Sequence, residues 1–262
     1  MRVAQLGAGQ PDVAVVGSIH GDEPCGATAI ERLIEDDPPV RKPVKLIIAN
    51  DEALERDVRY VDADLNRAFD DDVPEDALER GLADQLATEL RGTTALSIHS
   101  TQSYPYPFAI SAGIKEHVRA IAPKLSVRAL VDTGSPNEGR VFEADADIIE
   151  VEAGLQKSDA AAENAYRLVR EFLTATRVLP GETTSKELPL YQMGEPIEKP
   201  EAAAYEVFAE NFSRVEADEP FASADGVRIS DPTPFYPVLL SAYGYEDIFG
   251  YRGEKLGTIS AN

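Results

Sequence analysis

Short apolar runs alternate with longer amphipathic segments through the first two thirds of the chain. Runs typical of buried strands lie at residues 13–16, 44–49, 95–98, 127–131 and 148–151. Segments whose apolar residues recur at helical spacing lie at residues 24–36, 78–90, 114–122 and 161–177. This alternation predicts an α/β fold, in which helices cover both faces of a mostly parallel or mixed sheet.

The pattern changes after residues 179–181. Prolines and glycines become frequent there, and no helix of useful length fits the rest of the chain. We therefore expect strands and many turns in this part. The sequence predicts an α/β domain over residues 1–180 and a small C-terminal β-rich domain over residues 181–262. The polar residues 51–74 predict a long loop within the first domain.

The chain is strongly acidic. Its 262 residues include 25 Lys and Arg against 47 Asp and Glu, which gives a formal net charge of −22. Such a negative field repels phosphates, so we expect neither nucleic acid nor an anionic membrane surface as a partner. Only 8 of the basic residues are lysine. This composition is typical of salt-loving organisms, where salt screens the self-repulsion of the chain, and an ordinary acidic protein is the alternative.

Two further features bear on location. No apolar run approaches the roughly 18–20 residues that span a bilayer, and the first residues lack the charged-then-apolar pattern of an export segment. The single cysteine, Cys25, excludes an internal disulfide framework and fits a reducing compartment. We therefore expect a cytoplasmic protein.

Two of the three histidines stand directly after predicted strands. His20 follows residues 13–16, and His99 follows residues 95–98. Ligands of open α/β sheets bind where the strands end, so both imidazoles are expected to face one crevice. Glu23 comes three residues after His20, and two imidazoles with one carboxylate form a common catalytic zinc set. A bare His-x-x-Glu pair is more often structural, but the second strand-end histidine favours the metal interpretation.

A catalytic zinc site also needs a base that moves the proton of the attacking water. Glu152 follows a third predicted strand and is the candidate. Glu150 has the same side-chain phase on a regular strand and competes with it. Either acid is also compatible with a plain loop position in a chain this rich in carboxylates. His117 lies within a predicted helix and is expected to be a surface or half-buried residue.

The segment 59–67 holds a dense cluster of polar residues. Asn66 and Arg67 together suit a carboxylate, because the guanidinium binds it in a bidentate manner and the amide adds donors. Asp64 could orient a metal-bound histidine. The alternative is that Arg59 and Arg67 form ion pairs with the neighbouring aspartates.

Four motifs occur in the order known from one family. They are residues 17–23 (GSIHGDE), 64–67 (DLNR), 98–99 (IH) and 152–154 (EAG). In this order they resemble the aspartoacylase/succinylglutamate desuccinylase family of zinc carboxypeptidase-like deacylases. The resemblance spans nearly the whole chain. It implies a carboxypeptidase-like α/β catalytic domain and a smaller C-terminal β domain.

The resemblance also implies roles for single residues. His20, Glu23 and His99 would bind one zinc ion per chain, and Glu152 would be the general base. Arg59 matches an arginine of the family's active site, where it would help to hold the oxyanion of the reaction.

On the substrate side, the resemblance implies that Asn66 and Arg67 bind a carboxylate and that Asp64 lies beside them. Arg140 is a loose match, two residues out of register, for a further arginine. Tyr245 fits the register of a tyrosine that reaches the active site, with Tyr243 one short slip away.

Some positions depart from the family pattern. Asp22 stands where asparagine is frequent, and Leu155 replaces a proline after the base. These differences bear on the substrate rather than on the metal.

These residues predict a zinc-dependent hydrolase that cleaves the amide bond of an N-acyl amino acid or a similar small carboxylated amide. Its partner would be a small anionic substrate, and a homo-oligomer is compatible with the sequence. One alternative is a zinc carboxypeptidase acting on peptide C-termini. The other is a metal-dependent binding protein without turnover.

Overall fold

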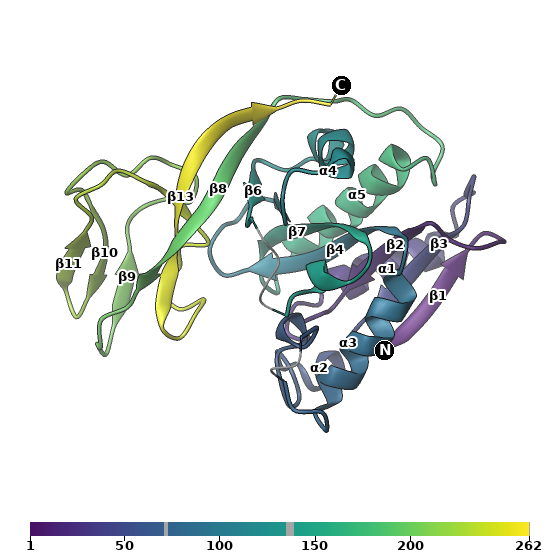
Figure 1. Cartoon of the computed structure of the whole chain (residues 1–262), viewed down its shortest axis with the longest axis horizontal. Coiled ribbons are helices and arrows are strands. Elements are labelled where there is room, and N and C mark those ends of the chain that lie inside the picture. The colour runs from purple at the N-terminus through teal and green to yellow at the C-terminus, as the bar shows by residue number, and fades with distance from the viewer. Residues whose placement is uncertain (71–72, 135–138, 262) are drawn as a thin grey trace.

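The computed structural model describes residues 1–70, 73–134 and 139–261. Two sheets and several flanking helices make up these residues (Figure 1). The strands are β1 (Arg2–Leu6), β2 (Val13–Gly17), β3 (Val44–Ile48), β4 (Thr94–Thr101), β5 (Phe108–Ser111), β6 (Leu130–Asp132), β7 (Asp147–Leu155), β8 (Leu188–Glu198), β9 (Tyr205–Val207), β10 (Pro220–Ala224), β11 (Val227–Ser230), β12 (Tyr236–Val238) and β13 (Ile248–Ile259). The α-helices are α1 (Cys25–Asp36), α2 (Asp51–Arg56), α3 (Leu78–Leu90), α4 (Glu116–Ile121) and α5 (Asp159–Ala175), and the 3₁₀ turns are η1 (Leu65–Arg67), η2 (Ala122–Lys124) and η3 (Val141–Glu143).

The larger sheet has ten strands in the order β1-β3-β2-β4-β7-β5-β6-β8-β13-β12. Its central strands β3, β2, β4 and β7 run parallel, whereas β5 is antiparallel to β7. The carboxyl ends of β2, β4 and β7 therefore meet at one edge of the sheet. The predicted mixed α/β sheet with flanking helices is confirmed.

Both faces of this sheet are buried, as strand β2 shows. Val13 and Val15 pack into one apolar cluster together with residues of α1 and α5. Ala14 and Val16 point to the opposite face and pack with the leucines of α3. Because neighbouring side chains of a strand point to opposite faces, a strand covered on both sides needs a continuous apolar sequence. This requirement explains the VAVV run.

The predicted strands and helices of the first 178 residues are present, with shifted ends. One prediction is wrong: the segment 51–74 is not a loop throughout, because α2 occupies its first six residues. The side chain of Asn50 accepts a hydrogen bond from the Ala53 amide at 3.2 Å and caps this helix. A helix this short leaves no periodicity to detect. Strands β1 and β5 were also not predicted.

The C-terminal part is β-rich, as expected. Strands β8, β13 and β12 extend the large sheet, and β9, β10 and β11 form a separate antiparallel sheet of three strands, seen at the left of Figure 1. The domain boundary at residue 180 remains a prediction, since β6 and β8 pair across it. Among the described helices, none is long and apolar enough to cross a bilayer.

Candidate functional site

A tight turn carries His20 and Glu23 from the end of β2 to the start of α1. Ser18 has a left-handed backbone (φ 53°), and the Glu23 amide donates to the carbonyl of His20 at 3.3 Å. A Cβ atom on Gly21 would lie 2.1 Å from the carbonyl carbon of Ala53 in α2. Only glycine fits there, because the turn packs directly against the backbone of α2.

The turn places Glu23 between the imidazole of His20 and that of His99, which lies within β4. Glu23 Oε1 lies 2.8 Å from His20 Nδ1, and Glu23 Oε2 lies 3.1 Å from His99 Nδ1. The backbone amide of Ser100 also donates to Glu23 Oε2 at 3.1 Å. All three candidate ligands are buried, and one donor atom from each lies within 4.8 Å of the others. The group therefore has the composition and the compactness of a metal site.

Burial and neighbouring charges act in opposite directions on the pKa values of these three residues. Burial alone would lower the pKa of both imidazoles, but neighbouring carboxylates outweigh it and raise the pKa of His20 and of His99. Burial alone would raise the pKa of Glu23, yet the two imidazoles hold it well below its usual range.

The two competing acids of β7 both line the cavity but differ in their partners. Glu150 Oε1 accepts from Asn66 Nδ2 at 3.3 Å and lies 3.4 Å from His99 Nε2. Glu152 Oε2 is buried and has no hydrogen-bond partner among the described residues. Burial and the charge of Glu23 raise the pKa of Glu152 to about 8. Of the two, Glu152 has the oxygen that is available to a ligand.

The segment 59–67 connects to the metal group through an arginine and an aspartate. Arg59 Nη2 lies 3.0 Å from His20 Nε2 and also donates to Asp64 Oδ2 at 3.0 Å. Asp64 Oδ1 lies 3.0 Å from His20 Nε2 and accepts from the Asn66 amide at 2.8 Å. Arg59 therefore does pair with a neighbouring aspartate, and both side chains also contact the imidazole.

Asn66 is engaged with the protein on both ends of its amide. Its Oδ1 accepts from the Val141 amide at 2.9 Å, while its Nδ2 donates to Glu150. Arg67 Nη1 donates to the Asn66 carbonyl at 2.7 Å. Asn66 thus ties the loop to η3 and β7. The cationic residues in the cavity wall are Arg59, Arg67 and Arg140.

These residues line a cavity of about 440 Å³. Every candidate site residue predicted from the sequence lines it: His20, Glu23, Arg59, Asp64, Asn66, Arg67, His99, Arg140, Glu152 and Tyr245. Tyr243 does not; its hydroxyl accepts from the Tyr205 amide at 3.2 Å. His117 also lies elsewhere, 3.0 Å from Asp147. The roles of the lining residues remain predictions.

Glu79 was not predicted from the sequence; it is buried and accepts hydrogen bonds from backbone amides of the segment 61–63. A signal for its burial exists, because Glu79 precedes Leu82 and Leu86 of the α3 stripe by three and seven positions. Gln102 and Gln156 were also missed; both line the cavity, and they bond to each other at 3.2 Å.

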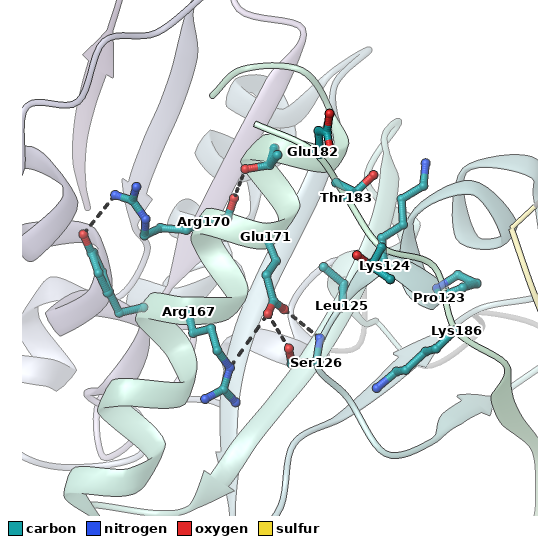
Figure 2. Close-up of a pocket in the computed structure, with 13 residues that line it drawn as sticks. Pro123, Lys124, Leu125, Ser126, Arg167, Arg170, Glu171, Glu182, Thr183 and Lys186 are labelled. Atoms are coloured by element: carbon teal, nitrogen blue, oxygen red, sulfur yellow. Dashed lines mark hydrogen bonds and ion pairs between the residues drawn. The ribbon is translucent and has the colours of Figure 1, made fainter. Parts of the chain in front are cut away.

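A second cavity of about 630 Å³ lies between α5 and the segments 123–126 and 182–186 (Figure 2). Glu171 occupies its wall and accepts from the Ser126 amide at 2.6 Å. Lys186 donates to the carbonyl of Val127 at 2.6 Å. None of the residues predicted for the functional site lines this cavity.

Comparisons with known proteins agree on one group. The model of the succinylglutamate desuccinylase/aspartoacylase catalytic domain matches residues 9–175. A succinylglutamate desuccinylase of Vibrio cholerae is 29% identical over 125 residues, which are 46% of this chain and 36% of that protein. An N-acyl-aromatic-L-amino acid amidohydrolase of Xenopus laevis is 40% identical over 60 residues, which are 22% of this chain and 20% of that protein. The matched part therefore spans about a third or less of these curated relatives.

Solved structures show the same fold over nearly the whole chain. Murine aminoacylase 3 superposes with a TM-score of 0.74 at 20% identity, covering 97% of this chain and 98% of that one. The ectoine utilization protein EutE of Ruegeria pomeroyi superposes with a TM-score of 0.76 at 17% identity, covering 99% and 88%. At these identities the likeness concerns the fold alone.

Proposed function

Because the chain belongs to the succinylglutamate desuccinylase/aspartoacylase family, we propose that it is a zinc-dependent hydrolase that cleaves the amide bond of a small N-acyl amino acid. One observation carries the proposal: a buried His-Glu-His group shares a cavity with Glu152, whose Oε2 has no partner among the described residues. A buried carboxylate oxygen without a partner is costly, so its retention favours a functional role.

The donor set fits the proposed ion. Two imidazoles and one carboxylate leave a fourth position of a tetrahedral zinc site open, as in catalytic rather than structural sites. His20, Glu23 and His99 would hold the ion. When bound, zinc supplies Lewis acidity, which polarises a carbonyl group and makes water more acidic.

Glu152 would accept the proton of the attacking water on its free oxygen and pass it to the departing amine. Burial and the charge of Glu23 raise the pKa of Glu152, so its ionised form is a stronger base than an exposed glutamate. Glu150 is less suited to the task, since Asn66 and His99 already contact its Oε1.

The arginines would handle the negative charges of the reaction. Arg59 contacts both His20 and Asp64, so its guanidinium is held beside the metal group, where it could donate to a developing oxyanion. Arg67 and Arg140 would bind the substrate carboxylate. A chain with a net charge of −22 needs such a local cationic patch to admit an anion.

The test combines metal analysis with a substrate panel. The purified protein is analysed for bound zinc and assayed at low and high salt on N-acetyl, N-succinyl and longer N-acyl amino acids, with peptides as a separate arm. We expect about one zinc per chain and turnover of at least one N-acyl amino acid. Turnover of peptides alone would support a carboxypeptidase instead, and full zinc occupancy without any hydrolysis would contradict the proposal.

A further inference from the structure

The carboxylate of Glu79 binds backbone amides of residues 61–63, in the segment that precedes η1. Its Oε1 accepts from the Val61 amide at 2.7 Å, and its Oε2 accepts from the amides of Asp62 and Ala63 at 3.0 and 3.1 Å. The side-chain amide of Asn50 donates to Oε1 at 2.9 Å. Four donors thus converge on one fully buried carboxylate.

These contacts are stronger than ordinary turn hydrogen bonds, because the acceptor is charged. The converging amides outweigh burial and lower the pKa of Glu79, so the carboxylate stays ionised near neutral pH. The bonding is also reciprocal, since Asp62 Oδ2 accepts from the Leu78 amide at 2.9 Å. The loop and the first turn of α3 therefore lock each other.

In the sequence, the amides that Glu79 binds lie between polar residues whose side chains line the cavity. Arg59 precedes them by two residues, Asp64 follows directly, and Asn66 and Arg67 come next. The candidate metal ligands belong to other elements, namely the turn after β2 and the strand β4. Glu79 itself does not line the cavity. It can therefore influence one wall of the site without touching a substrate or an ion.

We propose that Glu79 is a positioning residue, which sets where Arg59, Asn66 and Arg67 stand relative to the metal group. The proposal rests on the proposed function for the meaning of those side chains. Without the carboxylate, three consecutive amides lose their acceptor and the loop gains conformational freedom. Substrate capture then weakens, because a misplaced guanidinium loses its bidentate geometry.

Glu79→Gln is the first test variant, since it keeps the size of the side chain but replaces one acceptor oxygen by a donor. Glu79→Asp keeps the charge and shortens the reach, and should recover part of the effect. Glu89→Gln is the matched control, because Glu89 lies on the same helix and its carboxylate pairs with Lys45 at 2.8 Å, outside the loop. Bound zinc, KM and kcat are measured for all three.

We expect Glu79→Gln to raise KM for a carboxylated substrate about tenfold. The variant should still hold about one zinc ion per chain, because the three candidate ligands lie on other elements. The KM of Glu79→Asp should fall between those of Glu79→Gln and the wild type, and Glu89→Gln should match the wild type. A purely structural role would instead reduce zinc content and kcat together and leave KM unchanged. That result would overturn the proposal.

Hydrogen exchange provides a readout that needs no turnover. The amides of residues 61–63 should exchange faster in Glu79→Gln than in the wild type, and at the wild-type rate in Glu89→Gln. Unchanged exchange would overturn the proposal even for an active enzyme. If the wild type hydrolyses no substrate, the proposed function fails, and exchange alone then decides whether Glu79 positions the loop.

Discussion

The two cavities differ less in volume than in their buried polar atoms, which have hydrogen-bond partners in one cavity and lack them in the other. The larger one, beside α5, has charged groups that the protein itself engages: Glu171 with Ser126, and Lys186 with Val127. The smaller one holds buried oxygens of Asp22, Ser100 and Glu152 without partners among the described residues. None of the unpartnered buried atoms found in the described chain lines the larger cavity.

This contrast separates a site from a gap between elements. Burying a polar atom without a partner costs free energy, so several such atoms in one cavity favour a ligand there. Ser18 and Ser111 also have unpartnered hydroxyls among the described residues, but they line neither cavity. Cavity volume carries no such cost and therefore carries little functional information. Paired substitutions, one in each cavity, are the direct way to challenge this argument.

The largest effect is expected from Glu152→Gln. Turnover should fall about 10²- to 10⁴-fold, because the amide cannot accept a proton, while bound zinc should remain. Glu171→Gln is the same substitution in the other cavity and should leave kcat unchanged. Steady-state assays with parallel metal analysis measure both. Near-normal turnover of Glu152→Gln would move the role of base to Glu150.

Removing a candidate ligand should chiefly weaken zinc binding. His99→Ala is expected to weaken zinc binding by more than about 100-fold, since even neighbours of a ligand cost 10- to 100-fold when lost. His117→Ala is the matched control, because His117 pairs with Asp147 outside the cavity. Competition with a chelator gives the affinities. Equal zinc affinity of the two variants would remove His99 from the ligand set.

The convergence of the site residues in the smaller cavity could be predicted from the sequence, because it follows from the order and direction of the strands. Parallel strands end at the same edge, so His20, His99 and Glu152 had to lie close together once three strands were recognised. Their residue types then indicated a metal and a base. The resemblance to a known family, now supported by the match over residues 9–175, added the arginines of the loop.

The parts that escaped prediction depend on contacts between distant segments. Glu79 resembles any acidic helix residue until Val61 and its neighbours fold onto it. Strand β13 pairs with β8 across register shifts, and this pairing carries the C-terminal part onto the large sheet. The helical stripe of α3 indicates that Glu79 is buried, but it does not show which amides its carboxylate binds. The strand pairing has no local signature, because it arises from backbone hydrogen bonds, which every sequence can make.

Arg67→Ala should separate substrate binding from chemistry. KM for a carboxylated substrate is expected to rise roughly 10- to 100-fold, the cost of losing hydrogen bonds to a charged group, and a neutral amide should change far less. Arg170→Ala removes an arginine from the wall of the larger cavity and should change neither value. An equal loss for charged and neutral substrates would contradict the anchoring role of Arg67.

The pH dependence of stability should show the anchoring of the loop. Since the folded state lowers the pKa of Glu79, its carboxylate contributes stability above the pKa of the unfolded chain, about 4.3. That contribution is lost as the pH falls through the folded value. Urea titrations should therefore show a wild-type advantage over Glu79→Gln at neutral pH that shrinks in acid. A gap that stays constant with pH would mean that the charge is irrelevant.

The smallest effect is expected from Glu171→Gln on stability. Its carboxylate accepts from both the amide and the hydroxyl of Ser126, so the substitution should cost about 1–2 kcal/mol of unfolding free energy. Zinc content and KM should not change, because no residue of the larger cavity reaches the metal group. A shift of KM in this variant would couple the two cavities and break the distinction between them. A stability loss with intact catalysis would instead mark the larger cavity as part of the scaffold.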